Sequence, residues 1–105
     1  MPNLAQNVYT LLSQVPKGRV TTYKALANAV NSKAYRAIGQ ILRTNPNAPQ
    51  VPCHRVVKSD GSIGGYKGQT SGVEIRHKIA ILKKEGVEVI NGKVVNFDKI
   101  SYRFE

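Results

Sequence analysis

The chain has 105 residues, which is enough for one domain around a single hydrophobic core but not for two. Its 16 Lys and Arg against six Asp and Glu leave a formal net charge of +10 at pH 7, which favours a polyanionic partner and ranks nucleic acid ahead of a membrane surface. The single cysteine excludes an internal disulfide. The apolar runs are too short to cross a membrane, and the N-terminus has no signal-peptide pattern. Together these features predict a cytoplasmic protein, or a nuclear one in a eukaryote.

Two amphipathic helices are predicted at the start of the chain. The first covers residues 3–15, where one apolar stripe is formed by Leu4, Val8, Leu11, Leu12 and Val15. Pro16 and Gly18 end it, and Thr21 or Thr22 can cap a second helix. Tyr23 begins the apolar repeat of that second helix. It is either a core aromatic residue, the usual interpretation, or a hydroxyl that faces a ligand.

The third predicted helix runs from about Lys33 to Arg43 and has a basic side. That side consists of Lys33, Arg36, Gln40 and Arg43, and small residues lie between them at Ala34, Ala37 and Gly39. Two helices joined by a short turn, the second of them basic, make a helix-turn-helix candidate. The alternative is a basic face that is simply solvated.

A loop with three prolines, residues 44–52, leads to the only cysteine in the chain, Cys53, and to His54. A thiol beside an imidazole is a candidate nucleophile, although a small buried cysteine and a surface histidine are the commoner interpretation of these two residues alone. We expect residues 54–58 to form a strand. Because adjacent side chains in an extended segment point in opposite directions, a water molecule would bridge the thiol and the imidazole better than a direct hydrogen bond could join them. The imidazole also needs an orienting carboxylate, for which Glu85 is the candidate; its alternative is a surface residue.

The second half of the chain predicts a turn at residues 59–62, a returning segment at 63–66 and a fourth helix from Ser71 or Gly72 to Gly86. The glycines at 64, 65 and 68 indicate either backbone close to a ligand or ordinary loop residues. Asn91-Gly92, between valine-rich arms, predicts a hairpin with a type I′ turn. The tail alternates apolar and polar residues and is expected to be extended.

The motif Pro52-Cys53-His54-Arg55-Val56-Val57 resembles the active-site signature of the O6-alkylguanine-DNA alkyltransferases, also called methylated-DNA–protein-cysteine methyltransferases. Other segments resemble the same family in the same order. They are residues 20–23 with Leu26-Ala27, residues 34–39, residues 43–46, Gly64-Gly65-Tyr66 and residues 83–86. The resemblance covers nearly the whole chain.

The resemblance implies a mainly α-helical fold with small β-hairpins, a winged-helix-like helix-turn-helix domain of the alkyltransferase catalytic type. It would span residues 1–105 as a single domain, without the N-terminal domain usual in the family. The implied reaction is direct reversal of DNA damage: an alkyl group moves irreversibly from O6 of guanine (or O4 of thymine) to Cys53 after nucleotide flipping. No cofactor or metal is expected, and the partner would be double-stranded DNA bound by a monomer through the minor groove. Two alternatives are a non-enzymatic, alkyltransferase-like lesion sensor and a plain DNA-binding regulator.

Roles for individual residues also follow from the resemblance. Cys53 would be the nucleophile, His54 its base and Glu85 the orienting group, while Tyr23 would assist rotation of the nucleotide and Asn45 would brace the active-site turn. The residues that would contact DNA are Lys33, Ala34, Arg36, Ala37, Gly39, Gln40, Arg43 and Arg55, with Arg36 filling the space vacated in the base stack. The substrate pocket would be lined by Tyr23, Val56, Gly65, Tyr66 and Lys67. Lys67 and Tyr35 are bulkier than the residues expected at their positions.

Overall fold

The computed structural model describes residues 4–31, 33, 35–44, 51–66, 72–102 and 104. Within these ranges it is mainly helical with two small sheets, as predicted. In chain order the elements are α1 (Leu4–Leu12), β1 (Thr21–Thr22), α2 (Tyr23–Ala29), α3 (Tyr35–Arg43), the 3-10 turn η1 (Cys53–Arg55), β2 (Val56–Val57), α4 (Val73–Lys84), β3 (Val89–Ile90), β4 (Lys93–Val94) and α5 (Phe97–Ile100). None of the helices in the described ranges has the length and apolarity needed to cross a membrane.

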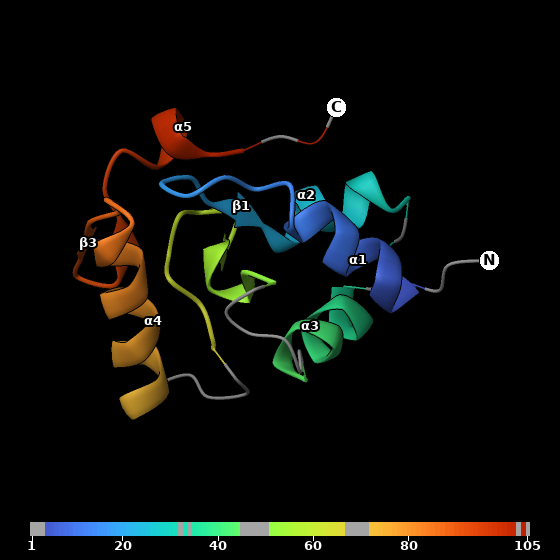
Figure 1. Ribbon diagram of the computed structural model, residues 1–105, viewed down its shortest axis with the longest axis horizontal. Coiled ribbons are helices and arrows are strands. Elements are labelled where there is room, and N and C mark those ends of the chain that lie inside the picture. The colour runs from blue at the N-terminus through green and yellow to red at the C-terminus, as the bar shows by residue number, and fades with distance from the viewer. Residues whose placement is uncertain are drawn as a thin grey trace.

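Helices α1, α2 and α3 pack against one another at one end of the molecule (Figure 1). Their apolar stripes meet in a buried core that includes Val8, Leu12, Leu26 and Ile38. Thr22 caps α2 as predicted, because its hydroxyl accepts a hydrogen bond from the backbone N–H of Ala25 at 3.0 Å. The helix-turn-helix prediction is therefore matched by two packed helices.

The ends of two helices differ from the prediction. Helix α1 ends at Leu12 and not at residue 15, because the backbone N–H groups of Gln14 and Val15 bond three residues back, which tightens the chain ahead of Pro16. Val15 stays buried in the core all the same. Helix α3 begins at Tyr35, so Lys33 precedes the helix.

The segment after Cys53 was predicted as a strand, and this is wrong for His54 and Arg55. Both lie in η1, where the N–H of Arg55 donates to the carbonyl of Pro52 at 3.0 Å. The strand β2 that follows does not pair with residues 63–66 either. It pairs in parallel with β1, with Val56 opposite Thr21, because β1 offers a backbone edge that the local sequence does not reveal. The turn at 59–62 is confirmed.

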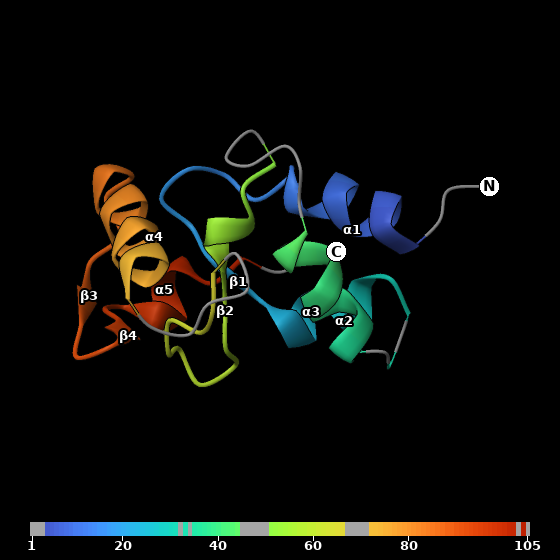
Figure 2. The same ribbon diagram turned by 90° about the horizontal axis from the view of Figure 1, so that it is seen from below.

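At the other end of the molecule, α4 and the hairpin β3–β4 enclose a second, smaller core (Figure 2). The hairpin turn is of the predicted type, since Asn91 and Gly92 both have positive φ, +52° and +74°. Between the hairpin and the tail, the chain forms one helical turn, α5, which was not predicted; the tail was expected to be extended, and Ser101, which follows α5, has extended backbone. The tail then returns to the centre, where the N–H of Tyr102 donates to the carbonyl of Val20 at 2.6 Å. Between the two ends lie β1, β2 and η1 (Figures 1 and 2).

Candidate active site

The thiol of Cys53 is at the start of η1, in the middle of the molecule, and only 6% of the residue is exposed. It belongs to the same core cluster as Tyr66, with Tyr23 packed against that cluster. Burial, followed by the negative charge that Cys53 would carry, raises the pKa of Tyr23 and raises the pKa of Tyr66 to about 12. Both phenols therefore keep their protons at neutral pH and can donate hydrogen bonds beside the sulfur.

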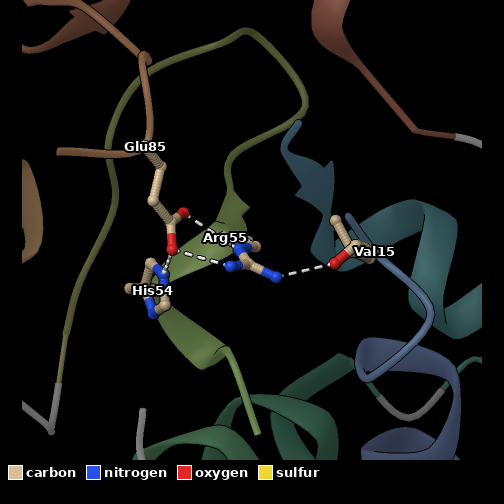
Figure 3. Close-up of polar contacts among 4 residues, drawn as sticks. All are labelled: Val15, His54, Arg55 and Glu85. Atoms are coloured by element: carbon tan, nitrogen blue, oxygen red, sulfur yellow. Dashed lines mark hydrogen bonds and ion pairs between the residues drawn. The ribbon is translucent and has the colours of Figure 1, made fainter. Parts of the chain in front are cut away.

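Directly after Cys53 in the chain, His54 and Arg55 form a hydrogen-bonded network with Glu85 (Figure 3). The Nε2 atom of His54 lies 3.0 Å from Oε2 of Glu85, which follows the last residue of α4. Arg55 holds the same carboxylate with two bonds, from Nε to Oε1 at 2.9 Å and from its guanidinium Nη2 to Oε2 at 2.6 Å. Burial alone would raise the pKa of Glu85, but the bonds from Arg55 and His54 outweigh it and lower that pKa. The network therefore holds a carboxylate against the imidazole.

The imidazole of His54 is 1% exposed, and its second ring nitrogen, Nδ1, is buried with no hydrogen-bond partner among the described residues. Figure 3 shows this nitrogen on the side of the ring away from Glu85. Burial lowers the pKa of His54 and outweighs the opposing effect of the Glu85 hydrogen bond, so the ring is neutral at pH 7. With its proton on Nε2, facing the carboxylate, the ring leaves Nδ1 as a proton acceptor.

Arg55 was expected to contact DNA, and its side chain lies mostly inside the molecule. It is 15% exposed, and besides Glu85 it donates to the carbonyl of Val15 at 2.8 Å (Figure 3). The guanidinium thus joins Glu85, at the end of α4, to the segment after α1. It supports the carboxylate of Glu85, and a contact with DNA stays a prediction.

Lys78 supports the candidate site and was not among the residues predicted from the sequence. It is 0% exposed, and its Nζ donates to the carbonyls of Val56 at 2.8 Å and Gly65 at 2.9 Å, and also to that of Ile63. These carbonyls belong to β2 and to the predicted pocket wall, so one side chain of α4 holds both in place. A signal was present in the sequence, because Lys78 occupies the apolar stripe of α4, three residues after Ile75.

The basic side of α3 lies in solvent, as expected for a binding face. Arg36, Gln40 and Arg43 are exposed and so is Lys33 just before the helix, whereas Ile38 is buried on the inner side. The small residues Ala37 and Gly39 are partly buried, and space remains open beside Gly39. Predictions for Ala34, Asn45, Lys67 and the side chain of Tyr35 fall outside the described residues.

The other predicted pocket residues lie close to the thiol. Val56 and Tyr66 share the buried cluster of Cys53, and Gly65 adjoins Tyr66 and contributes a carbonyl to Lys78. The structure therefore brings together Cys53, His54 and Glu85 with both phenols of the predicted pocket, from segments as far apart as α2 and the end of α4. The arrangement places a buried thiol in one cluster with two tyrosines, and the residue after it in the chain is an imidazole bonded to a carboxylate.

Comparison with known proteins identifies relatives of this site. Residues 3–87 match the protein family described as "6-O-methylguanine DNA methyltransferase, DNA binding domain". A bifunctional methyltransferase/endonuclease of Picrophilus torridus is 42% identical over 103 residues, which are 97% of this chain and 32% of that protein. The chain thus spans about a third of the length of this relative and of its counterpart from Thermoplasma volcanium.

Solved structures also resemble most or all of the chain. Atl1 of S. pombe, crystallised with damaged DNA that contains O6-carboxymethylguanine, matches with a TM-score of 0.82 at 25% identity, over 99% of this chain and 100% of the other. The O6-methylguanine-DNA methyltransferase of Pyrococcus kodakaraensis matches with a TM-score of 0.69 at 40% identity, over 83% of this chain and 48% of the other.

Proposed function

Because the chain belongs to the family of 6-O-methylguanine DNA methyltransferase DNA-binding domains, we propose that it repairs alkylated DNA by taking the alkyl group from O6 of guanine onto Cys53. The observation that carries this proposal is the network beside the thiol: the buried imidazole of His54 is bonded to Glu85 through Nε2 and keeps Nδ1 free to accept a proton. A thiol needs such a base, since the thiolate is the nucleophile.

In the proposed reaction, the thiol proton of Cys53 passes through a bridging water to Nδ1 of His54, and Glu85 stabilises the imidazolium that forms. The sulfur attacks the alkyl carbon from the side opposite O6. An S–C bond forms, the C–O6 bond breaks, and its electron pair leaves with the guanine. The phenol of Tyr23 donates a hydrogen bond to the departing base. The product is a thioether with no easily displaced group, so each molecule acts once.

The exposed basic side of α3 supports DNA as the partner. Arg36 and Arg43 are exposed on a helix that carries the small residues Ala37 and Gly39 between them, and the narrow minor groove accepts such a face. Arg36 would occupy the position that the flipped nucleotide leaves. Binding without base-specific contacts suits a protein that must find damage in any sequence.

A second candidate function is lesion recognition without transfer. The similarity to Atl1 over 99% of this chain favours it, and Atl1 was solved with damaged DNA. The cysteine at position 53 and the free nitrogen of His54 favour transfer, because a sensor has no need of a proton acceptor beside a thiol.

The intact mass of the protein distinguishes the two. After incubation with duplex DNA that contains O6-methylguanine, we expect a gain of one methyl group per chain, located on Cys53 and absent from Cys53→Ala. Lesion-selective binding without any gain in mass would establish the sensor instead. Binding that ignores the lesion would leave only a general DNA-binding protein.

A further inference from the structure

A hollow of about 430 Å³ lies beside Tyr23, which packs against the buried cluster that contains Cys53. Its other lining residues come from the start of α2 and from the turn after β2. They are Lys24, Lys58, Ser59 and Asp60. The proposed reaction has no use for these residues, and the basic side of α3 does not include them.

Lys24 and Lys58 are both exposed. Neither ammonium group has a hydrogen bond or a salt bridge within the described part of the chain, although the charge of Lys58 also attracts the carboxylate of Asp60. The one carboxylate, Asp60, uses Oδ1 to accept hydrogen bonds from the backbone and hydroxyl of Ser62, at 2.9 and 2.6 Å. Two lysines and one aspartate leave the lining with a charge of 2 − 1 = +1, which suits an anion.

The geometry brings the stem of Lys58 close to Tyr23. A Cβ built on Gly64 would lie 3.5 Å from Cγ of Lys58 and 3.5 Å from the hydroxyl of Tyr23. These two atoms are therefore at most 7.0 Å apart, and Gly64, with a φ of +67°, adds no side chain there. The stem of Lys58 is thus close to a phenol whose ring packs against the cluster of Cys53.

From these observations we propose that Lys24 and Lys58 together bind one backbone phosphate adjacent to the flipped nucleotide. This inference rests on the proposed function, because only a nucleotide rotated out of the duplex towards Cys53 brings its own phosphates to the hollow beside Tyr23. An ammonium group is a compact charge that does not require bidentate geometry, so two of them from different segments can hold one phosphate from two sides. The hydroxyl of Ser59 is available as a third donor.

The test joins a change in the protein to a change in the DNA. Affinity is measured in a Cys53→Ser background, so that no alkyl transfer disturbs the equilibrium, with duplexes that carry O6-methylguanine. In one set of duplexes, a neutral methylphosphonate replaces the phosphate on the 3′ or the 5′ side of the lesion. The protein carries Lys24→Gln with Lys58→Gln, or Lys17→Gln with Lys84→Gln as a matched control that removes two exposed lysines elsewhere.

We expect Lys24→Gln/Lys58→Gln to weaken binding about tenfold and to reduce the salt dependence by about one phosphate contact. One of the two methylphosphonates should weaken binding by the protein that keeps both lysines by a similar factor. The same methylphosphonate should cause no further loss in Lys24→Gln/Lys58→Gln. In the control variant Lys17→Gln/Lys84→Gln, the methylphosphonate should weaken binding as much as it does in the protein with all its lysines. Asp60→Asn, which keeps the acceptor for Ser62, should bind more tightly.

The inference would be overturned if each methylphosphonate weakened binding by the same factor in Lys24→Gln/Lys58→Gln as in the protein that keeps both lysines. Because affinity is read without transfer, a chain that shows the coupling but never gains a methyl group retains the phosphate site and loses only the proposed repair. A chain that repairs DNA without the coupling loses only the phosphate site. If the protein does not bind the lesion selectively, both the proposed repair and the phosphate site are overturned.

Discussion

The buried lysine of α4 offers the sharpest test of how the site is held together. In Lys78→Met, a side chain of similar length fills the space, but the carbonyls of Val56, Ile63 and Gly65 lose their common donor. A buried carbonyl without a donor costs about 1 kcal/mol or more. The variant should therefore be less stable than the parent and should hold β2 and the pocket wall less firmly.

The size of this effect depends on pH. Burial lowers the pKa of Lys78 from its ordinary value of 10.5 to about 7, so between these values the unfolded chain binds more protons than the folded one. Stability from this group is consequently present above pH 10.5 and is lost as the pH falls towards 7. Linkage gives the parent about 2 kcal/mol of extra stability at pH 9 compared with pH 7, and Lys78→Met lacks this gain.

Urea denaturation of both chains at pH 7, 8 and 9 measures the effect. The destabilisation caused by Lys78→Met should grow by about 2 kcal/mol across this range, while other titrating groups cancel in the difference. Three carbonyls also match the three N–H groups of an ammonium ion, which opposes the effect of burial. A destabilisation that stays constant from pH 7 to 9 would mean that the three carbonyls keep Lys78 charged and that burial does not lower its pKa to about 7.

Three further predictions concern the network, a turn and the DNA face. Glu85→Gln leaves the guanidinium of Arg55 without its carboxylate and should lower the free energy of unfolding, measured with urea, by about 2 kcal/mol. Methyl transfer should also be slower, and an unchanged transfer rate would exclude the carboxylate from the mechanism. Gly61→Ala should cost about 2 kcal/mol, because φ is +86° and the new Cβ would lie 3.1 Å from Cγ of Phe97; a melting temperature equal to that of the parent would contradict this. Arg36→Ala should slow repair of duplex DNA more than reaction with the free alkylated base, and equal losses in two parallel rate measurements would refute its role in the base stack.

Much of the local structure could be predicted from the sequence. The apolar stripe of α1, the cap at Thr22 and the type I′ turn at Asn91-Gly92 each depend on residues a few positions apart, and each was confirmed. The stripe of α4 was confirmed in part, because Ile75 and Leu82 pack in the two cores and Ile79 belongs to neither core cluster of the described residues. The ends of elements were predicted less well. The tightened turn before Pro16 shortened α1, and the single helical turn of α5 is too short to leave a periodic pattern.

Within the candidate site, the sequence by itself indicated the candidate residues: one cysteine, the histidine that follows it and a carboxylate at Glu85. Only the tertiary structure decided that Glu85, 31 positions away, lies 3.0 Å from His54, and that Arg55 turns inward to hold it. It also decided that Lys78 crosses from α4 to the pocket wall. The physical reason is that such contacts depend on how α4 packs against η1, and packing between distant segments leaves no local pattern in the chain.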